Sequence, residues 1–261
     1  MTISMTTVND LYTFLDGKCP RSLSCSWDND GMMLVPDKHA PVTKVLCALD
    51  ITQRTIAEAE EEGCDCIVSH HPLIFHKLAA LHADDGTARL VMRLMEKKIA
   101  VLSFHTRLDA AVGGVNDTLC RKLGLAPAGT FGENGEALGR LAEYGTALPL
   151  ASFCAQIKAS LGSPVLHAVS AKKPVQKVAI LGGSGSDDWS AALAFGADTF
   201  LTGTMSYNAF LEAKEAGLNV VAAGHYYTEY PVTETLAMWI TQQFPDVVAG
   251  VSECPCEVLS I

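Results

Sequence analysis

The chain has 261 residues, of which 49% are hydrophobic and 18% are charged, so it can bury a substantial core and is not expected to be disordered. Its net charge of −10 disfavours a general nucleic-acid surface, which needs a basic footprint. No apolar stretch reaches the roughly 18 residues that span a bilayer, and the start lacks the features of a signal peptide. The nine cysteines follow no disulfide spacing, which favours reduced thiols in a cytoplasmic protein without membrane partners.

Predicted strands and helices alternate through the first half of the chain. We expect strands at 44–50, 65–69 and 100–104, and helices at 52–62, 85–98 and 116–123. Thr52 is a typical first residue for its helix, and Gly63 is a typical stop. This alternation predicts a layered α/β fold.

The same pattern restarts in the second half. We expect strands near 140–145, 165–170, 177–181, 198–202 and 219–223, and a last strand at 251–258. Helices are expected near 149–161, 187–195, 206–216 and 231–243.

The second half also repeats the first in its residues. Residues 44–69 align with 177–202 at a constant offset, and farther on His105 aligns with His225 and Asp109 with Glu229. We interpret this as an internal duplication that gives two similar α/β domains about a pseudo-two-fold axis. The first domain is predicted to contain residues 1–128 and 226–261, and the second residues 129–225.

Imidazoles and carboxylates follow three of the predicted strands, where cofactor sites often lie. The first half supplies His70, His71 and Asp109, and the second supplies His225 and Glu229. The doubled histidine aligns with Gly203 and Thr204, so only the first half carries it. Such a donor set without thiolates suits one or two divalent ions, Zn, Mn, Fe or Ni, at an open catalytic site in the cleft between the domains. Asp109 or Glu229 would bridge two ions.

Two features allow more than one interpretation. His105 is a ligand by symmetry with His225, or lies just outside the ligand shell and exchanges a proton with metal-bound water or substrate; we favour the second, catalytic role. The glycine-rich segment 182–185 is a tight turn capped by Asp187, or an anion nest at a helix start. Residues 27–31 are interpreted as an exposed turn.

These residues resemble those of the GTP cyclohydrolase 1 type 2 family, also called Nif-three-like or YbgI-like, whose members have a dinuclear metal centre. The matching segments are 69–75, 105–109, 116–117, 182–185, 196–203 and 224–229. The resemblance implies two similar α/β domains with a metal pair between them, and a ring-shaped homohexamer. It implies His70, His71, Asp109, His225 and Glu229 as ligands, with His105 close by.

The sequence also departs from that of other family members in three respects. The length leaves no room for the middle domain that some members carry. Arg107 stands where the family often has a small polar residue, and residues 204–207 replace an acidic, histidine-containing stretch. The last two departures are expected to alter the lining of the cleft.

The leading functional hypothesis is a metal-dependent hydrolase that uses metal-activated water on a small molecule. GTP is the substrate that the family name implies, while a phosphoesterase or amidohydrolase would use the same metal pair. The alternatives are a non-catalytic metal-binding adaptor, a metal storage or insertion protein, and a scaffold that metal only stabilises.

Overall fold

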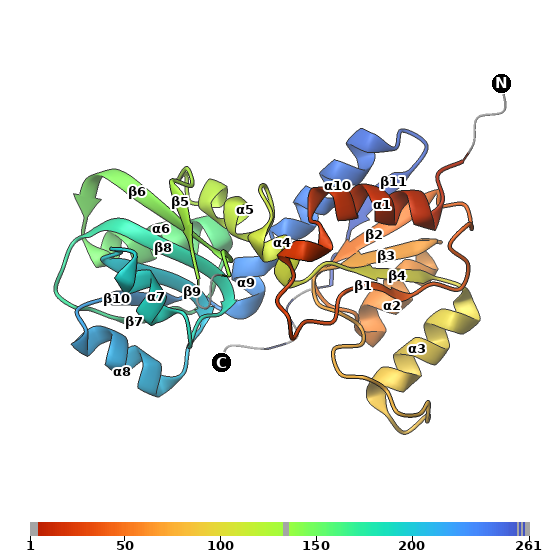
Figure 1. Cartoon of the computed structure of the whole chain (residues 1–261), viewed down its shortest axis with the longest axis horizontal. Helices are drawn as coiled ribbons and strands as arrows, with labels where there is room; N and C mark the ends of the chain where they lie inside the picture. The colour runs from red at the N-terminus through yellow and green to blue at the C-terminus, as the bar shows by residue number, and fades with distance from the viewer. Residues whose placement is uncertain (1–4, 133–135, 255, 257, 259–261) are drawn as a thin grey trace. The chain divides into compact units, whose positions relative to one another are not determined.

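The computed structural model describes residues 5–132, 136–254, 256 and 258. The chain forms two compact units, Met1–Leu108 with Thr233–Pro255 and Asp109–Val232 with Cys256–Ile261. Each unit contains one β-sheet with helices on both faces (Figure 1), so the predicted α/β fold is confirmed. The chain passes between the units after Leu108 and Val232, whereas the sequence placed the domain boundaries at 128/129 and 225/226. That division of the duplicated segments stays a prediction.

The first unit is built on a five-stranded sheet with the order β1-β4-β3-β2-β11. The strands are β1 (Gly31–Leu34), β2 (Lys44–Ala48), β3 (Cys66–Ser69), β4 (Ala100–Ser103) and β11 (Val248–Val251). All but β1 run parallel, and β1 is antiparallel to β4. Helices α2 (Gln53–Glu61) and α3 (Gly86–Lys97) connect β2 to β3 and β3 to β4. The carboxyl ends of these three strands therefore lie at one edge of the sheet.

The two connecting helices begin and pack as the sequence predicts. The side chain of Thr52 accepts a hydrogen bond from the backbone of Thr55, and that of Asp85 accepts one from Ala88. These caps satisfy backbone N–H groups that have no partner within a first helical turn. One hydrophobic core joins both helices to one face of the sheet. Its members include Leu46, Ile67 and Val101 from the strands and Ile56 and Leu94 from the helices.

Helices α1 (Val8–Lys18) and α10 (Val232–Gln243) cover the opposite face of the first sheet (Figure 1). The ring of Phe14 meets that of Phe244 edge-on at 5.5 Å. The ammonium of Lys18 lies 5.6 Å from the ring centroid of Trp239. The sequence predicted α10 but left α1 and the short 3-10 helix Arg21–Leu23 unassigned.

The second unit contains a six-stranded sheet with the order β5-β6-β8-β9-β10-β7. The strands are β5 (Gly129–Phe131), β6 (Gly139–Leu148), β7 (His167–Val169), β8 (Val175–Ser184), β9 (Thr199–Thr204) and β10 (Asn219–Ala222). Strands β8, β9 and β10 run parallel, and the remaining pairs are antiparallel. The central part of the sheet therefore has the same strand directions as β2, β3 and β4.

Helices cover both faces of this second sheet as well (Figure 1). They are α5 (Val115–Lys122) and α6 (Leu150–Leu161) on one face and α7 (Trp189–Ala194) and α8 (Tyr207–Glu215) on the other. Successive residues of β8 point to opposite faces: Val178 and Ile180 pack in the core with α5 and α6, while Ala179 and Leu181 pack in the core with α7 and α8. This alternation follows from the pleat of a strand.

The repeat predicted from the sequence is present in the register and hydrogen bonds of the two sheets. Val45 pairs with Cys66, and the aligned residues Val178 and Thr199 pair in the same way. A carboxylate also accepts hydrogen bonds from the backbone near the start of β2 in the first unit and of β8 in the second. Asp65 accepts from the backbone of Lys44 at 3.1 Å, and Asp198 accepts from that of Lys177 at 2.7 Å. The two units therefore share a β-α-β-α-β frame.

Several elements differ from the predicted ones, including strands β1 and β5, which the sequence analysis did not assign. Short helices, α4 (Thr106–Ala110) and α9 (His225–Glu229), follow β4 and β10, where the sequence analysis assigned none. The last strand is β11, which ends at Val251, so the strand expected at 251–258 is wrong in its bounds; residues 255 and 257 of that range lie outside the described residues. Residues 248–251 pair in parallel with β2, a long-range pairing that no local pattern indicates.

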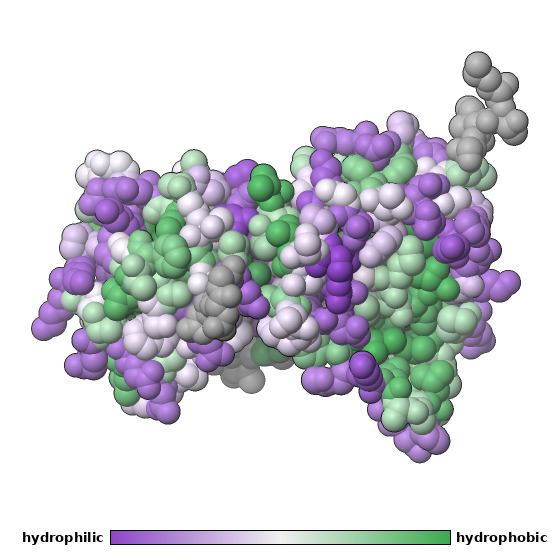
Figure 2. Space-filling model, viewed as in Figure 1, coloured by the Kyte–Doolittle hydropathy of each residue, from purple (hydrophilic) through white to green (hydrophobic). Residues whose placement is uncertain are grey.

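The polarity of the surface and the state of the cysteines can be compared with the sequence, which predicted reduced thiols. Figure 2 shows hydrophilic residues across the visible face and a hydrophobic area over α3 and the segment before it, where Leu81 and Met95 are exposed. All nine cysteines are free thiols. Within the described part of the chain, no helix is both long and apolar enough to cross a membrane.

Candidate metal centre

Three imidazoles of the first unit lie together beyond the ends of two neighbouring strands. His70 and His71 follow β3, and His105 follows β4 after one residue. The strands are parallel, with Ser69 paired to Ser103, so the residues after both leave the sheet at the same edge. One nitrogen from each imidazole lies within 4.8 Å of the others. The sequence analysis expected His70 and His71 as ligands and His105 close by, and the geometry of the three suits a metal ion.

An oxygen atom engages the Nδ1 atom of each of these imidazoles. The pairs are His70 with the backbone oxygen of Phe104 at 3.0 Å, His71 with Asp50 at 2.7 Å, and His105 with Asp28 at 2.9 Å. A proton on Nδ1 donates in each pair, which places the ring's lone pair on Nε2. Metal-binding histidines commonly show this arrangement, because the outer oxygen fixes the tautomer and the ring orientation. The residues present therefore fit a divalent ion.

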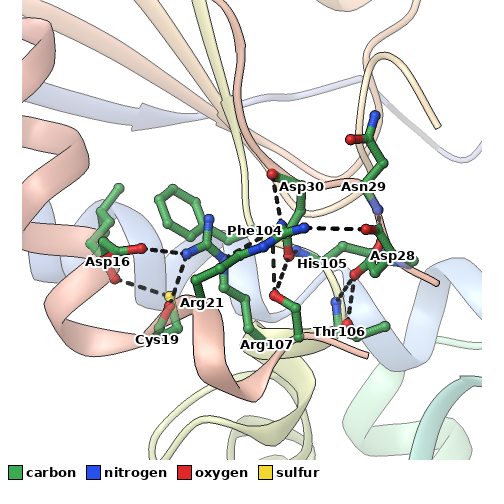
Figure 3. A network of polar contacts seen from close by, with 12 residues as sticks. Asp16, Cys19, Arg21, Asp28, Asn29, Asp30, Phe104, His105, Thr106 and Arg107 are labelled. Carbon is green, nitrogen blue, oxygen red and sulfur yellow. Dashed lines mark hydrogen bonds and ion pairs between the residues drawn. The ribbon is translucent and has the colours of Figure 1, made fainter. Parts of the chain in front are cut away.

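Asp28 is buried beside His105, and its carboxylate accepts four hydrogen bonds (Figure 3). One carboxylate oxygen accepts from the backbone of Thr106 at 3.0 Å and from its hydroxyl at 2.6 Å. The other accepts from His105 and from the backbone of Asn29. Burial alone would raise the pKa of Asp28, but the hydrogen bonds from His105 and Thr106 outweigh it and hold the pKa well below its usual value. Asp28 is thus ionised and orients His105.

Arg107 is buried in the same network and does not line an open surface (Figure 3). Its Nη1 atom lies 2.6 Å from Asp16, and its Nε atom lies 3.3 Å from Asp30. Its guanidinium carbon lies 4.4 Å from the ring centroid of Phe104. Burial by itself would lower the pKa of Arg107, but Asp30, Tyr12 and Asp16 outweigh it and raise that pKa. The expectation that Arg107 alters the cleft lining is therefore wrong.

The segment 27–31 also differs from its interpretation as an exposed turn. Asp28 and Asp30 are buried, while Trp27 between Ser26 and Asp28 is exposed. Arg21 pairs with Asp30, which completes the burial of that carboxylate. The sequence analysis missed both aspartates: Asp28 contacts His105, and Asp30 pairs with Arg107.

In the second unit, His225 and Glu229 occupy consecutive turns of α9. The Nε2 atom of His225 lies 3.0 Å from the carboxylate of Glu229. Gly224, with a φ of 88°, allows the chain to turn from β10 into the helix. The helix packs closely on the end of β8, since a Cβ added to Gly183 would lie 2.2 Å from Glu229.

Residues 182–184 of the glycine-rich segment are the last residues of β8, and Gly185 follows the strand. The backbone N–H of Gly182 donates to the side chain of Asn116 at 2.8 Å, and that of Gly183 donates to Thr228 at 3.1 Å. Protein groups therefore already occupy these two donors. Helix α7 starts after its N-cap residue Asp188, whose side chain makes no capping hydrogen bond, so the expected cap at Asp187 is wrong. Because Gly182 and Gly183 have no side chain, α9 can lie close to the end of β8.

The remaining expected ligand, Asp109, lies in α4. Its backbone oxygen accepts a hydrogen bond from the side chain of Asn116 at 3.4 Å. The chain passes from the first unit to the second inside this helix, so the six residues expected at the site divide equally. The first unit holds His70, His71 and His105, and the second holds Asp109, His225 and Glu229.

Comparison with known proteins gives a consistent result. Residues 6–256 match the model of the family described as Duf34/NIF3 (NGG1p interacting factor 3). A protein of Clostridium perfringens named GTP cyclohydrolase 1 type 2 homolog is 35% identical over 230 residues, which cover 86% of this chain and 87% of the relative.

Solved structures are similar over nearly the whole chain. The crystal structure of the Staphylococcus aureus hypothetical protein SA1388 has a TM-score of 0.89 and 28% identity, and the match covers 98% of this chain and 99% of that one. A Bacillus cereus protein related to NIF3 also has a TM-score of 0.89, at 22% identity, and covers 99% of each chain. At that identity the second likeness concerns the fold alone.

Proposed function

This chain belongs to the Duf34/NIF3 family, and from that premise we propose that it is a metal-dependent hydrolase acting on a small molecule. One observation carries the proposal: three imidazoles lie together in the first unit, each with its Nδ1 atom engaged by an oxygen. Such support from outer oxygens is typical of a built metal site and is not needed by surface histidines.

We further propose that the centre holds two divalent ions. His70 and His71 of the first unit and Asp109, His225 and Glu229 of the second are the proposed ligands. Imidazole and carboxylate donors without a thiolate suit Zn, Mn, Fe or Ni. The ordinary thiols support this choice of donors, because burial raises the pKa of Cys47 and of Cys66 above the usual value and keeps both protonated.

When bound, a divalent ion lowers the pKa of a coordinated water molecule toward neutrality and polarises the substrate. The residues of the chain have separate tasks. His105 is the proposed catalytic residue: its Nδ1 atom is held by Asp28, so Nε2 receives and returns a proton. Asp28 is a positioning residue, because it fixes the tautomer and the ring orientation of His105.

GTP is the first substrate that we propose, because relatives carry the name GTP cyclohydrolase 1 type 2 homolog. We also propose that the protein works in the cytoplasm as a ring of six copies without an inserted middle domain. Light scattering tests the assembly, since a hexamer has six times the chain mass of 27.8 kDa.

The test of the function is turnover by protein loaded separately with each of the four metals. GTP, other nucleotides, phosphoesters and amides would be offered to the wild type, His105→Gln, Asp28→Asn and the control His39→Gln. His39 is exposed, and the carboxylate that it influences is Asp10 of α1, which is not a residue of the site. We expect His105→Gln to lose at least 100-fold in kcat with its metal content unchanged, Asp28→Asn to lose less, and the control to match the wild type.

Two results would contradict the proposal. Turnover that His105→Gln retains in full would remove the assigned catalytic residue. Absence of turnover with every metal and substrate class, together with full metal loading, would leave a metal-binding adaptor or a metal storage protein.

A further inference from the structure

Two exposed aromatic side chains lie beside His105 in the first unit. Trp27 is 58% exposed and Phe75 is 42% exposed. Their ring centroids lie 6.2 and 6.0 Å from that of His105 and 6.2 Å from each other, with interplanar angles between 69° and 89°. Three rings from separate segments thus meet edge to face. Exposed hydrophobic side chains grouped beside polar groups are typical of a binding surface.

Hydrogen bonds order the segments that carry the two exposed rings. The side-chain amide of Asn29 donates to the backbone oxygen of Ile74, which joins the segment of Trp27 to that of Phe75. Asp28, next to Trp27, is fixed by His105 and Thr106 (Figure 3). A surface that is ordered before binding loses little conformational entropy when a ligand arrives. The arrangement therefore suits recognition and not only packing.

The group also adjoins the three imidazoles. The ring centroid of His105 lies 5.2 Å from that of His70 and 5.7 Å from that of His71. A ligand seated on Trp27 and Phe75 would therefore lie beside the residues to which we assign metal and proton transfer. This position indicates a substrate and not a distant effector.

We infer that Trp27, Phe75 and His105 form a stacking platform for a small molecule with a planar heteroaromatic ring, such as a nucleobase. The inference deepens the proposed function and rests on it for the neighbouring chemistry. Aromatic side chains stack on every base, because each has a π face. The platform therefore recognises the ring of the ligand, and any phosphates are secondary to it.

The test measures binding and not turnover. In the full chain with Trp189→Phe and Trp239→Phe, Trp27 is the only tryptophan, so its fluorescence reports on the platform. Guanosine, adenosine, GTP and ring-free tripolyphosphate would be titrated into this protein with and without added metal. We expect the two nucleosides and GTP to quench Trp27, and tripolyphosphate to leave it unchanged.

Variants locate the binding site. Phe75→Ala is expected to weaken guanosine binding about tenfold, the effect of losing one stacking partner, and Phe75→Tyr to keep it. Trp27→Ala, followed by calorimetry, is expected to give a similar loss. Phe195→Ala is the matched control, because Phe195 is 56% exposed in the second unit.

Three outcomes would overturn the inference: no binding of either nucleoside, unchanged affinity in Phe75→Ala and Trp27→Ala, or a loss of binding that accompanies a change in the mass of the assembly. The last outcome would make the two rings a contact between copies of the chain. Failure of the proposed function is distinguishable. Ring binding that needs Phe75 without any turnover would retain the platform and remove the hydrolase, whereas turnover with an unchanged KM in Phe75→Ala would do the reverse.

Discussion

The two units have the same β-α-β-α-β frame but differ in the residues at the ends of their strands. In both units an aspartate accepts a hydrogen bond from the backbone of the first strand of this frame: Asp65 binds β2, and Asp198 binds β8. At the end of the second strand of this frame, the first unit has His70 directly after β3, and the second has the aligned residue Gly203 within β9. The comparison teaches that the frame and the functional residues are separable: the frame sets the positions at the strand ends, and the side chains there have diverged.

The divergence extends to how each unit supports its own histidine. His105 is held by Asp28 from a separate segment, whereas His225 contacts Glu229 of its own helix. The residue two positions after each histidine differs too, with a buried arginine at 107 and a tyrosine at 227. The first unit thus supports its imidazole from a separate segment, whereas the contact in the second unit lies within one helix.

The largest expected effect concerns this arginine. Arg107→Leu would remove the guanidinium that pairs with Asp16 and with the buried Asp30, which would keep only Arg21 as an ion-pair partner among the described residues. Removing one partner of a buried ion pair costs about 3 kcal/mol of unfolding free energy. Tyr227→Leu, at the aligned position, is expected to cost about 1 kcal/mol. Denaturant unfolding followed by circular dichroism measures both. Arg54→Leu is the control, because Arg54 is exposed. Equal losses at 107 and 227 would mean that the two networks do not differ as described.

Gly203 tests why the second unit lacks the doubled histidine. A Cβ at this position would lie 2.5 Å from the backbone oxygen of Gly183 and 2.6 Å from the hydroxyl of Thr228. Gly203→Ala is therefore expected to lower the unfolding free energy by about 2–3 kcal/mol. Gly145→Ala in β6 is the matched control, because no atom lies within 4 Å of its added Cβ. If the two alanine variants unfold alike, close packing of α9 is not what excludes a histidine.

Asp28 makes the support of His105 dependent on pH. The pKa of Asp28 is lower in the folded than in the unfolded chain, so its stabilisation is complete above the unfolded value of about 4 and is lost as the pH falls below it. Asp28→Asn should therefore be about 2 kcal/mol less stable than the wild type at pH 7. The difference should shrink steadily below about pH 4. Unfolding curves between pH 7 and 3 check this, and a constant difference would contradict the assignment.

The smallest effects should be equal in the two units. Asp65→Asn and Asp198→Asn each weaken two hydrogen bonds from backbone N–H groups at the start of a strand. We expect losses of about 1 kcal/mol each, measured by hydrogen exchange of the strands β2 and β8. A loss confined to one unit would show that the shared frame is not equally important in both.

The sequence predicted the repeated frame well and the support of the site poorly. The strands and connecting helices follow local patterns of hydrophobic residues and caps such as Thr52 and Asp85, which act over a few residues. His70, His71 and His105 were predicted to gather, because neighbouring parallel strands deliver them to one edge. Asp28, in contrast, reaches His105 from 77 positions away along the chain, and no local pattern indicates such a contact.

Long-range pairing explains the other differences. Strand β11 pairs with β2 across most of the chain, so its bounds depend on a partner that lies far away in the sequence. Arg107 was expected to alter the lining of the cleft because the family often has a small polar residue at this position. Its burial depends on Asp16 and Asp30, which compensate the charge together with the ring of Phe104.

The most direct test of the central claim is elemental analysis of protein purified without chelator. It would compare the wild type with His70→Ala from the first unit, Glu229→Ala from the second, and the control His39→Ala, with folding checked by circular dichroism. The account predicts about two transition-metal ions per chain in the wild type and the control, and a loss in both site variants while the fold remains. No bound metal even after reconstitution, or full metal content in both site variants, would contradict it.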